Sequence, residues 1–319
     1  MNRLNAVLLA AIGVALPLSL LAGRAWIAPW AEPVPNAAII LAELRLPRGL
    51  LALVIGAGLG GAGAAMQGYL RNPLADPGLF GIAPGAAFGA VMALFLGVAA
   101  IPLILPLFAL AGAAGAMALL ALIAGRTGGI ALFTLAGLMI ASLAGTLTSL
   151  TISLSPNPFA MSEIVTWLMG ALTDRSWADV WIAAPLTLAG LIVLALCGRS
   201  LDAMMLGEQA ALSLGVQARR LQWGIVAGVG LTIGAGVAVA GIIGFVGLMV
   251  PHLVRPFTDR RPSTLLVPSA LAGALLVLVA DTACRLAPMA SELRLGIALS
   301  LLGAPFFLAL LLRLRRELA

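Results

Sequence analysis

Long apolar stretches alternate with short polar connections along almost the whole chain. An α-helix needs roughly 20 apolar residues to cross a hydrocarbon core, and ten windows approach or exceed that length. They lie at residues 5–23, 49–70, 81–99, 104–124, 130–153, 178–197, 222–240, 242–256, 264–283 and 295–312, with Gly241 as the break between the seventh and eighth. The pattern predicts an all-α polytopic membrane protein, with about ten transmembrane helices in a single domain over residues 1–319.

The first two windows are separated by an irregular stretch. The window 5–23 stands where a secretory signal peptide would stand, but it is long and lacks a clear cleavage site, so we expect it to be the first span. Residues 25–44 contain three prolines and two acidic residues and are expected to form an irregular outer segment. The window 49–70 carries no charge and is dense in glycine and alanine. Small residues let neighbouring helices approach closely, so this window is predicted to lie deep in the bundle.

Two of the connections are long enough to hold structure of their own. Residues 154–177 contain two tryptophans, which favour a membrane interface, and are expected to form a short helix near the outer surface. Residues 198–221 form the longest polar interruption on the inner side. Within them, 208–214 is predicted to be helical, Gly215 to break that helix and 216–221 to restart one. Two short amphipathic helices there suggest a docking surface for a soluble partner.

Composition agrees with a membrane protein and excludes several classes of site. The chain is 62% hydrophobic and 9% charged, with a mean hydropathy of +1.13, whereas soluble chains carry about 25% charged residues. All 18 basic residues are arginine, so a phosphate-binding P-loop with its lysine is excluded. One histidine and two cysteines do not make a metal cluster. We therefore expect no catalytic residues, no metal and no cofactor.

The arginines also predict the orientation of the spans. The chain has a net charge of +6, but its arginines are scattered singly between apolar windows, which indicates membrane topology rather than nucleic-acid binding. Cytoplasmic loops carry the excess of arginine and lysine in membrane proteins. Ten spans with a cytoplasmic N-terminus place 12 arginines inside and six outside. The count supports a multi-pass protein of the inner (plasma) membrane with both termini in the cytoplasm.

Several stretches resemble the FecCD-type permeases, the membrane subunits of ABC importers for vitamin B12, haem and ferric siderophores. They keep the family's order and spread over nearly the whole chain. They are Arg45-Leu46-Pro47-Arg48, Met66-Gln67, Arg71-Asn72-Pro73-Leu74-Ala75-Asp76-Pro77, Trp167-Leu168-Met169-Gly170, Leu206-Gly207-Glu208, Leu214-Gly215-Val216, Gly244-Phe245-Val246-Gly247-Leu248-Met249-Val250-Pro251-His252-Leu253-Val254-Arg255, Ala280-Asp281, Glu292-Leu293 and Gly303-Ala304-Pro305. One departure is Arg294, where relatives commonly have a proline after Glu-Leu.

The resemblance implies a type II ABC importer permease fold of ten spans that works as a homo- or heterodimer of permease subunits. It implies two cytoplasmic ATP-binding subunits, where ATP hydrolysis occurs, and a periplasmic or lipid-anchored substrate-binding protein. Its matching positions assign docking of that binding protein to Arg45, Arg48 and Arg285, and the cytoplasmic gate to Asn72 and Leu74. The coupling helices, about 201–221, are assigned contact with the ATPase through Leu206, Gly207, Glu208, Leu212, Leu214, Gly215 and Val216.

Simpler roles remain open for each of these groups. The three arginines can extend from the membrane to the interface without a partner, with Asp281 one helical turn from Arg285 to hold it. Asn72 can merely cap a helix end. His252 is expected to be structural rather than a ligand. An ion-coupled secondary transporter is the alternative function; such proteins place ionisable groups in mid-membrane, and no predicted span has one at its centre.

Overall fold

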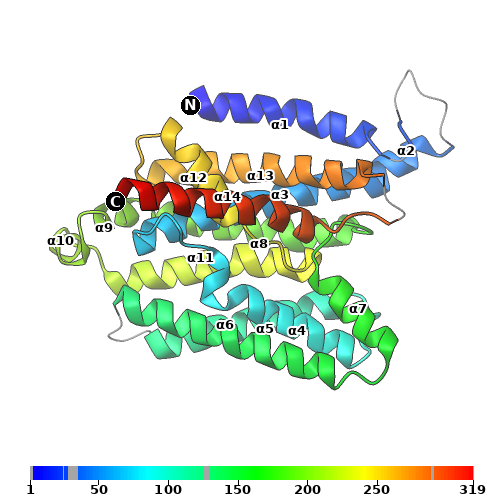
Figure 1. Ribbon diagram of the computed structural model, residues 1–319, viewed down its shortest axis with the longest axis horizontal. Coiled ribbons are helices and arrows are strands. Elements are labelled where there is room, and N and C mark those ends of the chain that lie inside the picture. The colour runs from blue at the N-terminus through cyan, green and yellow to red at the C-terminus, as the bar shows by residue number, and fades with distance from the viewer. Residues whose placement is uncertain (1–2, 24, 28–34, 125–128, 289–290, 319) are drawn as a thin grey trace.

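The computed structural model describes residues 3–23, 25–27, 35–124, 129–288 and 291–318, and these residues form helices and their connections without a β-strand. The helices are packed side by side in a bundle (Figure 1). In chain order they are α1 Arg3–Leu21, α2 Ala37–Ile39, η1 Ile40–Arg45, α3 Leu46–Leu70, η2 Pro77–Phe80, α4 Ile82–Phe95, α5 Ile104–Ala124, α6 Ile130–Ser153, α7 Pro158–Leu168, α8 Trp177–Leu196, α9 Gly198–Met204, α10 Glu208–Ser213, α11 Ala218–Ala240, α12 Val246–Val254, η3 Arg255–Phe257, α13 Pro262–Leu286 and α14 Leu295–Leu318.

The predicted all-α polytopic architecture is confirmed. Eight helical stretches in the described part of the chain have the length and hydropathy of membrane spans, and α4, with 14 residues, is a shorter apolar helix. The predicted span 242–256 is wrong as a full crossing. Its helix, α12, has nine residues, about 14 Å at 1.5 Å per residue. Gly241, at φ 71°, ends α11, and residues 242–245 do not continue the helix.

The helix that enters the centre of the bundle is longer than the sequence predicts. Helices α2, η1 and α3 form one continuous stretch from Ala37 to Leu70, 34 residues long. The irregular outer segment predicted at 25–44 therefore ends at Asn36, and its residues 28–34 lie outside the described part of the chain. The prolines of that segment all precede Ala37, and the apolar residues after them have no helix breaker until α3 is established.

Glycines of α3 bring its backbone against the backbone of α13. A Cβ added at Gly56 would meet the carbonyl group of Gly273, and one at Gly60 would meet the carbonyl oxygen of Ser269. A Cβ added at Gly63 would likewise meet the carbonyl group of Gly247 on α12. These glycines are buried, and each occupies a place where a larger residue does not fit. The small residues of α3 thus serve helix packing, as the sequence predicts.

The segment after α3 turns back along it. A Cβ at Gly247 would lie 2.7 Å from Cγ of Pro77 and 3.1 Å from the carbonyl oxygen of Leu59, which places Pro77 beside the middle of α3. Residues 72–76 therefore run antiparallel to the last three turns of α3 before η2 begins. Because the chain has already returned this far, α4 starts deep in the bundle and remains short.

Both predicted interfacial connections contain helices. In the first, α7 is capped by Asn157, whose Oδ1 accepts a hydrogen bond from the backbone N of Ala160 at 2.9 Å. In the second, α10 and the break at Gly215, φ 84°, are confirmed. The separate helix expected at 216–221 is wrong: α11 begins at Ala218 and continues without a break to Ala240. The second short helix is instead α9, directly after α8. Figure 1 shows α9 and α10 at one end of the bundle and α2 and α7 at the other.

Candidate functional site

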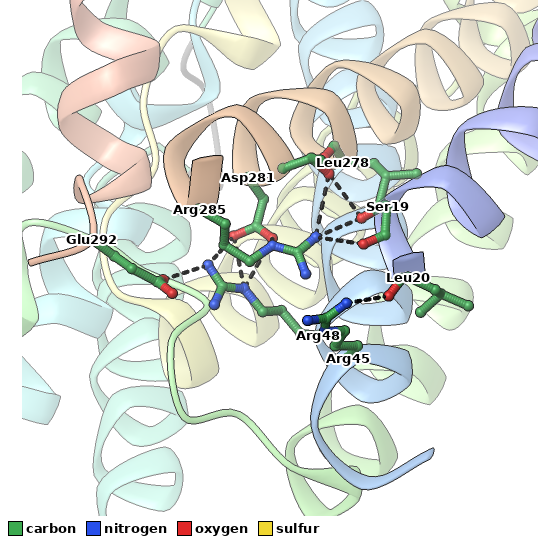
Figure 2. Close-up of polar contacts among 9 residues, drawn as sticks. Ser19, Leu20, Arg45, Arg48, Leu278, Asp281, Arg285 and Glu292 are labelled. Carbon is green, nitrogen blue, oxygen red and sulfur yellow. Dashed lines mark hydrogen bonds and ion pairs between the residues drawn. The ribbon is translucent and has the colours of Figure 1, made fainter. Parts of the chain in front are cut away.

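The end of the bundle that carries α2 contains a cluster of paired charges (Figure 2). Arg48 on α3 donates to both carboxylate oxygens of Asp281 on α13, from Nε to Oδ2 and from Nη2 to Oδ1 at 2.9 Å each, and from Nε to Oδ1 at 3.1 Å. The Nη2 group also donates to Oε2 of Glu292, before α14, at 2.9 Å. The side chains of Arg48 and Asp281 are 12% and 1% exposed. This bidentate geometry, satisfied on both sides, is the arrangement that makes a buried ion pair favourable.

Arg285 completes the cluster from the same face of α13. Its Nε lies 3.5 Å from Oδ2 of Asp281, one helical turn away, as the sequence predicts. Its Nη2 donates to Oγ of Ser19 on α1 at 2.6 Å and to the Ser19 carbonyl at 3.2 Å. Thr282 also donates to Oγ of Ser19, at 2.8 Å. The cluster therefore joins α1, α3, α13 and the segment that leads into α14.

Arg45 lies beside this cluster and binds only backbone oxygens. It donates to the carbonyls of Leu20, Leu21 and Ala25 at 2.8, 3.0 and 2.7 Å, respectively. Leu20 and Leu21 are the last two residues of α1, where carbonyls lack helical partners, and Ala25 follows the helix, so Arg45 caps the end of α1. All three predicted docking arginines line one cavity of about 260 Å³, together with Arg175, Asp174 and Glu292.

The structure thus brings Arg45, Arg48 and Arg285 together and shows what each already binds. Arg48 and Arg285 are largely buried and neutralised by carboxylates, whereas Arg45 has no carboxylate partner in the described part of the chain. An unpaired cation at the rim can attract an acidic partner, whereas one that is already neutralised attracts it less. Of the three, Arg45 retains most of that character, and docking stays a prediction for all of them.

The predicted gate residues lie at the opposite end of α3. Oδ1 of Asn72 accepts a hydrogen bond from the backbone N of Leu74 at 2.9 Å, which forms a local Asx turn. Asn72 is exposed and Leu74 is partly buried. The turn starts the segment that runs back along α3, so Asn72 shapes the chain there. A role in gating remains a prediction.

The predicted coupling residues lie around α9 and α10 and expose apolar side chains. Leu206, Leu212 and Leu214 are 69%, 50% and 65% exposed. Gly207, with φ 105°, and Gly215 give the turns on either side of α10 a backbone that favours glycine. Glu208 begins α10 and is partly buried. Leu214, Gly215 and Val216 also form one wall of a cavity of about 680 Å³ against the end of α8.

Asp76 is a partly buried acidic residue whose position inside the bundle the hydropathy windows did not predict. It borders a cavity of about 70 Å³ with Ile55 and Leu59 of α3 and the non-helical residues 241–245. Its Oδ1 accepts from the backbone N of Gly78 at 2.7 Å and so caps η2. The sequence places Asp76 in a loop between spans, and only the backward course of that loop brings the carboxylate beside mid-α3.

His252 of α12 packs edge-to-face against Phe306 of α14, with ring centroids 5.9 Å apart. This contact agrees with the structural role expected for the histidine. Within the described residues, no group of three or more histidine, cysteine or acidic side chains is placed to hold a metal ion.

Comparisons with known proteins agree over nearly the whole chain. The model of the FecCD transport family matches residues 8–313. The vitamin B12 import system permease protein BtuC of Escherichia coli is 38% identical over 307 residues, which cover 95% of this chain and 93% of that protein. An uncharacterized ABC transporter permease protein of Bacillus subtilis, YvrB, is 39% identical over 284 residues, covering 87% and 80% of the two chains.

The fold of this chain also matches a solved structure over nearly its whole length. One described as an inward-facing conformation of a metal-chelate type ABC transporter superposes with a TM-score of 0.90, at 30% identity, and covers 98% of this chain and 99% of its own. PsaBC from Streptococcus pneumoniae shares only the fold, with a TM-score of 0.54, 15% identity and coverage of 82% and 89%. The described helices, the glycine contacts and the family match over nearly the whole sequence lead to one conclusion: this chain is a membrane permease that belongs to the FecCD transport family.

Proposed function

We propose that this chain is the transmembrane permease subunit of an ATP-binding cassette importer that moves a metal chelate from periplasm to cytoplasm. The candidate substrates are ferric siderophores, haem and cobalamin. The observation that carries the proposal is the similarity, over nearly the whole chain, to a vitamin B12 import permease and to a transporter of the metal-chelate type. The chain itself performs no covalent chemistry in this proposal, and ATP hydrolysis occurs on a separate subunit.

The proposed assembly contains two permease subunits, identical or not, and two cytoplasmic ATP-binding subunits. A periplasmic or lipid-anchored binding protein delivers the substrate. The complex resides in the inner membrane with both termini of this chain in the cytoplasm. The start of α1 and the end of α14 lie toward the end of the bundle that carries α9 and α10 (Figure 1). That arrangement supports a common side for the termini and the coupling helices.

The exposed leucines around α9 and α10 support contact with an ATP-binding subunit. Exposed apolar side chains surrounded by polar residues mark interaction sites, because a partner that covers them removes apolar surface from water. In the proposal, closure of the ATPase pair moves this segment and re-aims the spans around a pathway between two permeases. Asn72 and Leu74 narrow that pathway on the cytoplasmic side, and Arg45, with Arg48 and Arg285, meets the binding protein on the other.

Reconstitution tests the proposal directly. The permease is purified with its ATP-binding subunit, placed in proteoliposomes and supplied with binding protein and a panel of ferric siderophores, haem and cobalamin. Uptake that requires ATP and stops when the ATP-binding subunit cannot hydrolyse it supports the importer. Uptake by the permease alone, driven by an ion gradient, would establish the alternative, an ion-coupled secondary transporter.

A further inference from the structure

Three arginines line one cavity of about 350 Å³ at the end of α3 opposite the ion-pair cluster. Arg71 follows the last residue of α3, Arg255 follows α12, and Arg260 lies two residues before α13. Arg255 and Arg260 belong to the same short connection between α12 and α13, and the fold brings Arg71 from the end of α3 to meet them. Arg71 and Arg260 are exposed, and Arg255 is half-buried. The rest of the lining includes Gln67, Gly68, Asn72, Met205 and Pro262.

A buried amide fixes the central arginine. Oε1 of Gln67, a residue only 3% exposed, accepts a hydrogen bond from Nη2 of Arg255 at 2.6 Å. The other end of the amide, Nε2, donates to the carbonyl oxygen of Leu248 at 3.1 Å. Gln67 can therefore present only its oxygen to Arg255, which holds the guanidinium at the cavity without neutralising it.

No carboxylate balances this charge within the described part of the chain. The ion pairs formed there include none of the three arginines. The acidic residues nearest to these arginines along the chain are already bound: Asp259, beside Arg260, to Thr264 and Arg261, and Asp76, five residues after Arg71, to the backbone N of Gly78. Burial, together with repulsion from Arg260, lowers the pKa of Arg255. Like charges around a half-enclosed cavity are stabilised when an anion occupies it.

The surroundings of the cavity indicate which anion. Each arginine stands where an apolar helix ends or begins, the depth at which lipid phosphates lie next to a span. Apolar side chains flank the charges: Leu253 is 49% exposed, Phe257 is 72% exposed, and Met205 in the cavity wall is 52% exposed. A free inorganic ion would leave these side chains in water. An amphiphile with a phosphate head and acyl chains would cover both kinds of surface.

We propose that the cavity lined by Arg71, Arg255 and Arg260 binds the phosphate of an anionic phospholipid from the adjoining leaflet. This proposal does not depend on the transported substrate. A cytoplasmic location for the cavity follows if α9 and α10 face the ATPase, since Arg71 Nη1 would lie 3.9 Å from a Cβ at Gly207, directly before α10. A lipid held there would contact the wall next to the coupling segment.

The test measures lipid binding to the purified full-length chain in neutral detergent. Phosphatidylglycerol, phosphatidylcholine and inorganic phosphate are titrated separately, and bound lipid is counted by native mass spectrometry alongside the thermal unfolding midpoint. We expect preferential binding of phosphatidylglycerol, about fivefold weaker for each arginine removed in Arg71→Gln and Arg260→Gln. Both side chains are exposed, so the variants are expected to fold even if Arg255→Gln does not. Arg261→Gln is the control, because it removes a neighbouring charge that does not line the cavity.

Each outcome decides the proposal. Selective binding lost in the cavity variants and kept in Arg261→Gln supports it. Equal stabilisation of the wild type by inorganic phosphate would overturn the lipid source and assign the cavity to a soluble oxyanion. Unchanged phosphatidylglycerol binding in the variants would overturn the site. If those variants instead fail to co-purify with the ATP-binding subunit, the cavity receives an acidic side chain of that partner, and the lipid proposal is wrong.

Discussion

Arg48 on α3 and Asp281 on α13 are 233 positions apart in sequence and form a bidentate ion pair with both shortest contacts at 2.9 Å. The pair lies at the end of these helices opposite Arg71. Farther along the same two helices, Gly56 and Gly60 meet α13 without any polar contact. The α3–α13 interface is therefore fixed by charge at one end and by backbone packing along its length.

Replacing Arg48 with alanine should destabilise the fold. Arg48→Ala leaves Asp281, which is 1% exposed, with only Arg285 as a charged partner at 3.5 Å. Loss of one member of a buried pair costs about 3 kcal/mol or more, so we expect a clearly lower unfolding midpoint in detergent. Arg261→Ala, where the side chain is 69% exposed, should change stability by less than about 0.5 kcal/mol. Equal midpoints for Arg48→Ala and wild type would show that the pair contributes nothing.

Docking and stability can be separated by a charge-conserving variant. Arg48→Lys keeps the charge but loses the fork that grips Asp281, so it should lower the unfolding midpoint while leaving binding-protein association unchanged. Arg45→Glu, which breaks no ion pair, should slow association, because a cation becomes a repulsive charge. The slowing should shrink with added salt, since the Debye length is about 8 Å at physiological ionic strength. Association rates of Arg45→Glu that match wild type at low salt would contradict a docking role.

The sequence predicts the long helices because their signal is local. A run of apolar residues identifies each span without knowledge of its neighbours, and eight of the described helical stretches are confirmed in this way. The glycine and alanine content of 49–70 also predicts the central place of α3. Short helices were expected between α8 and α11 because polar residues separate two apolar windows there, although the second helix proved to be α9. Their role in coupling stays a prediction.

Features formed by tertiary contacts were not predictable in the same way. Residues 241–245 are as apolar as a span, but Gly241 and Phe245 adopt positive φ and leave α12 only nine residues long. The course of residues 72–76 back along α3 depends on contacts of Pro77 with Gly247. Likewise, no pattern in the sequence indicates that Arg71 lies at one cavity with Arg255 and Arg260.

The α3–α13 contact predicts a position-specific effect of glycine substitution. Gly60→Val places a side chain against the carbonyl of Ser269, where there is no room. Overpacking of this kind typically costs about 1–3 kcal/mol, so we expect a lower unfolding midpoint and reduced yield. Gly115→Val on α5 is the matched control, since a Cβ there meets nothing within 4 Å. A similar loss in both variants would mean that valine itself, rather than the close contact, is responsible.

The orientation of the bundle is tested by labelling. In a chain with Cys197 and Cys284 replaced, single cysteines at Arg261 and Arg315 should react with a membrane-impermeant reagent only from the cytoplasmic side. A cysteine at Arg175, at the opposite end of the bundle, should react only from outside. Labelling of Arg261 and Arg315 positions from opposite sides would overturn the predicted topology.

The coupling segment gives the last prediction, because its leucines are exposed without an evident partner within the described chain. Leu212, on α10, is 50% exposed, so Leu212→Arg should be tolerated by the fold and leave the unfolding midpoint near that of wild type. It places a charge where an apolar contact with the ATP-binding subunit is proposed, and a charge buried without a partner weakens an interface strongly. We expect co-purification with that subunit to fall at least tenfold, or ATP hydrolysis to continue without transport.

The matched control is Gln209→Arg, which adds the same charge to an exposed polar position of the same helix. The backbone carbonyl of Gln209 accepts a hydrogen bond from Oγ of Ser213, four positions later, and a change of the Gln209 side chain leaves this bond in place. Normal assembly and transport in Gln209→Arg, with loss in Leu212→Arg, would identify the apolar face of α10 as the contact. If Leu212→Arg assembles and transports normally in proteoliposomes, α10 does not couple the two subunits, because an arginine buried there without a partner would weaken the contact strongly.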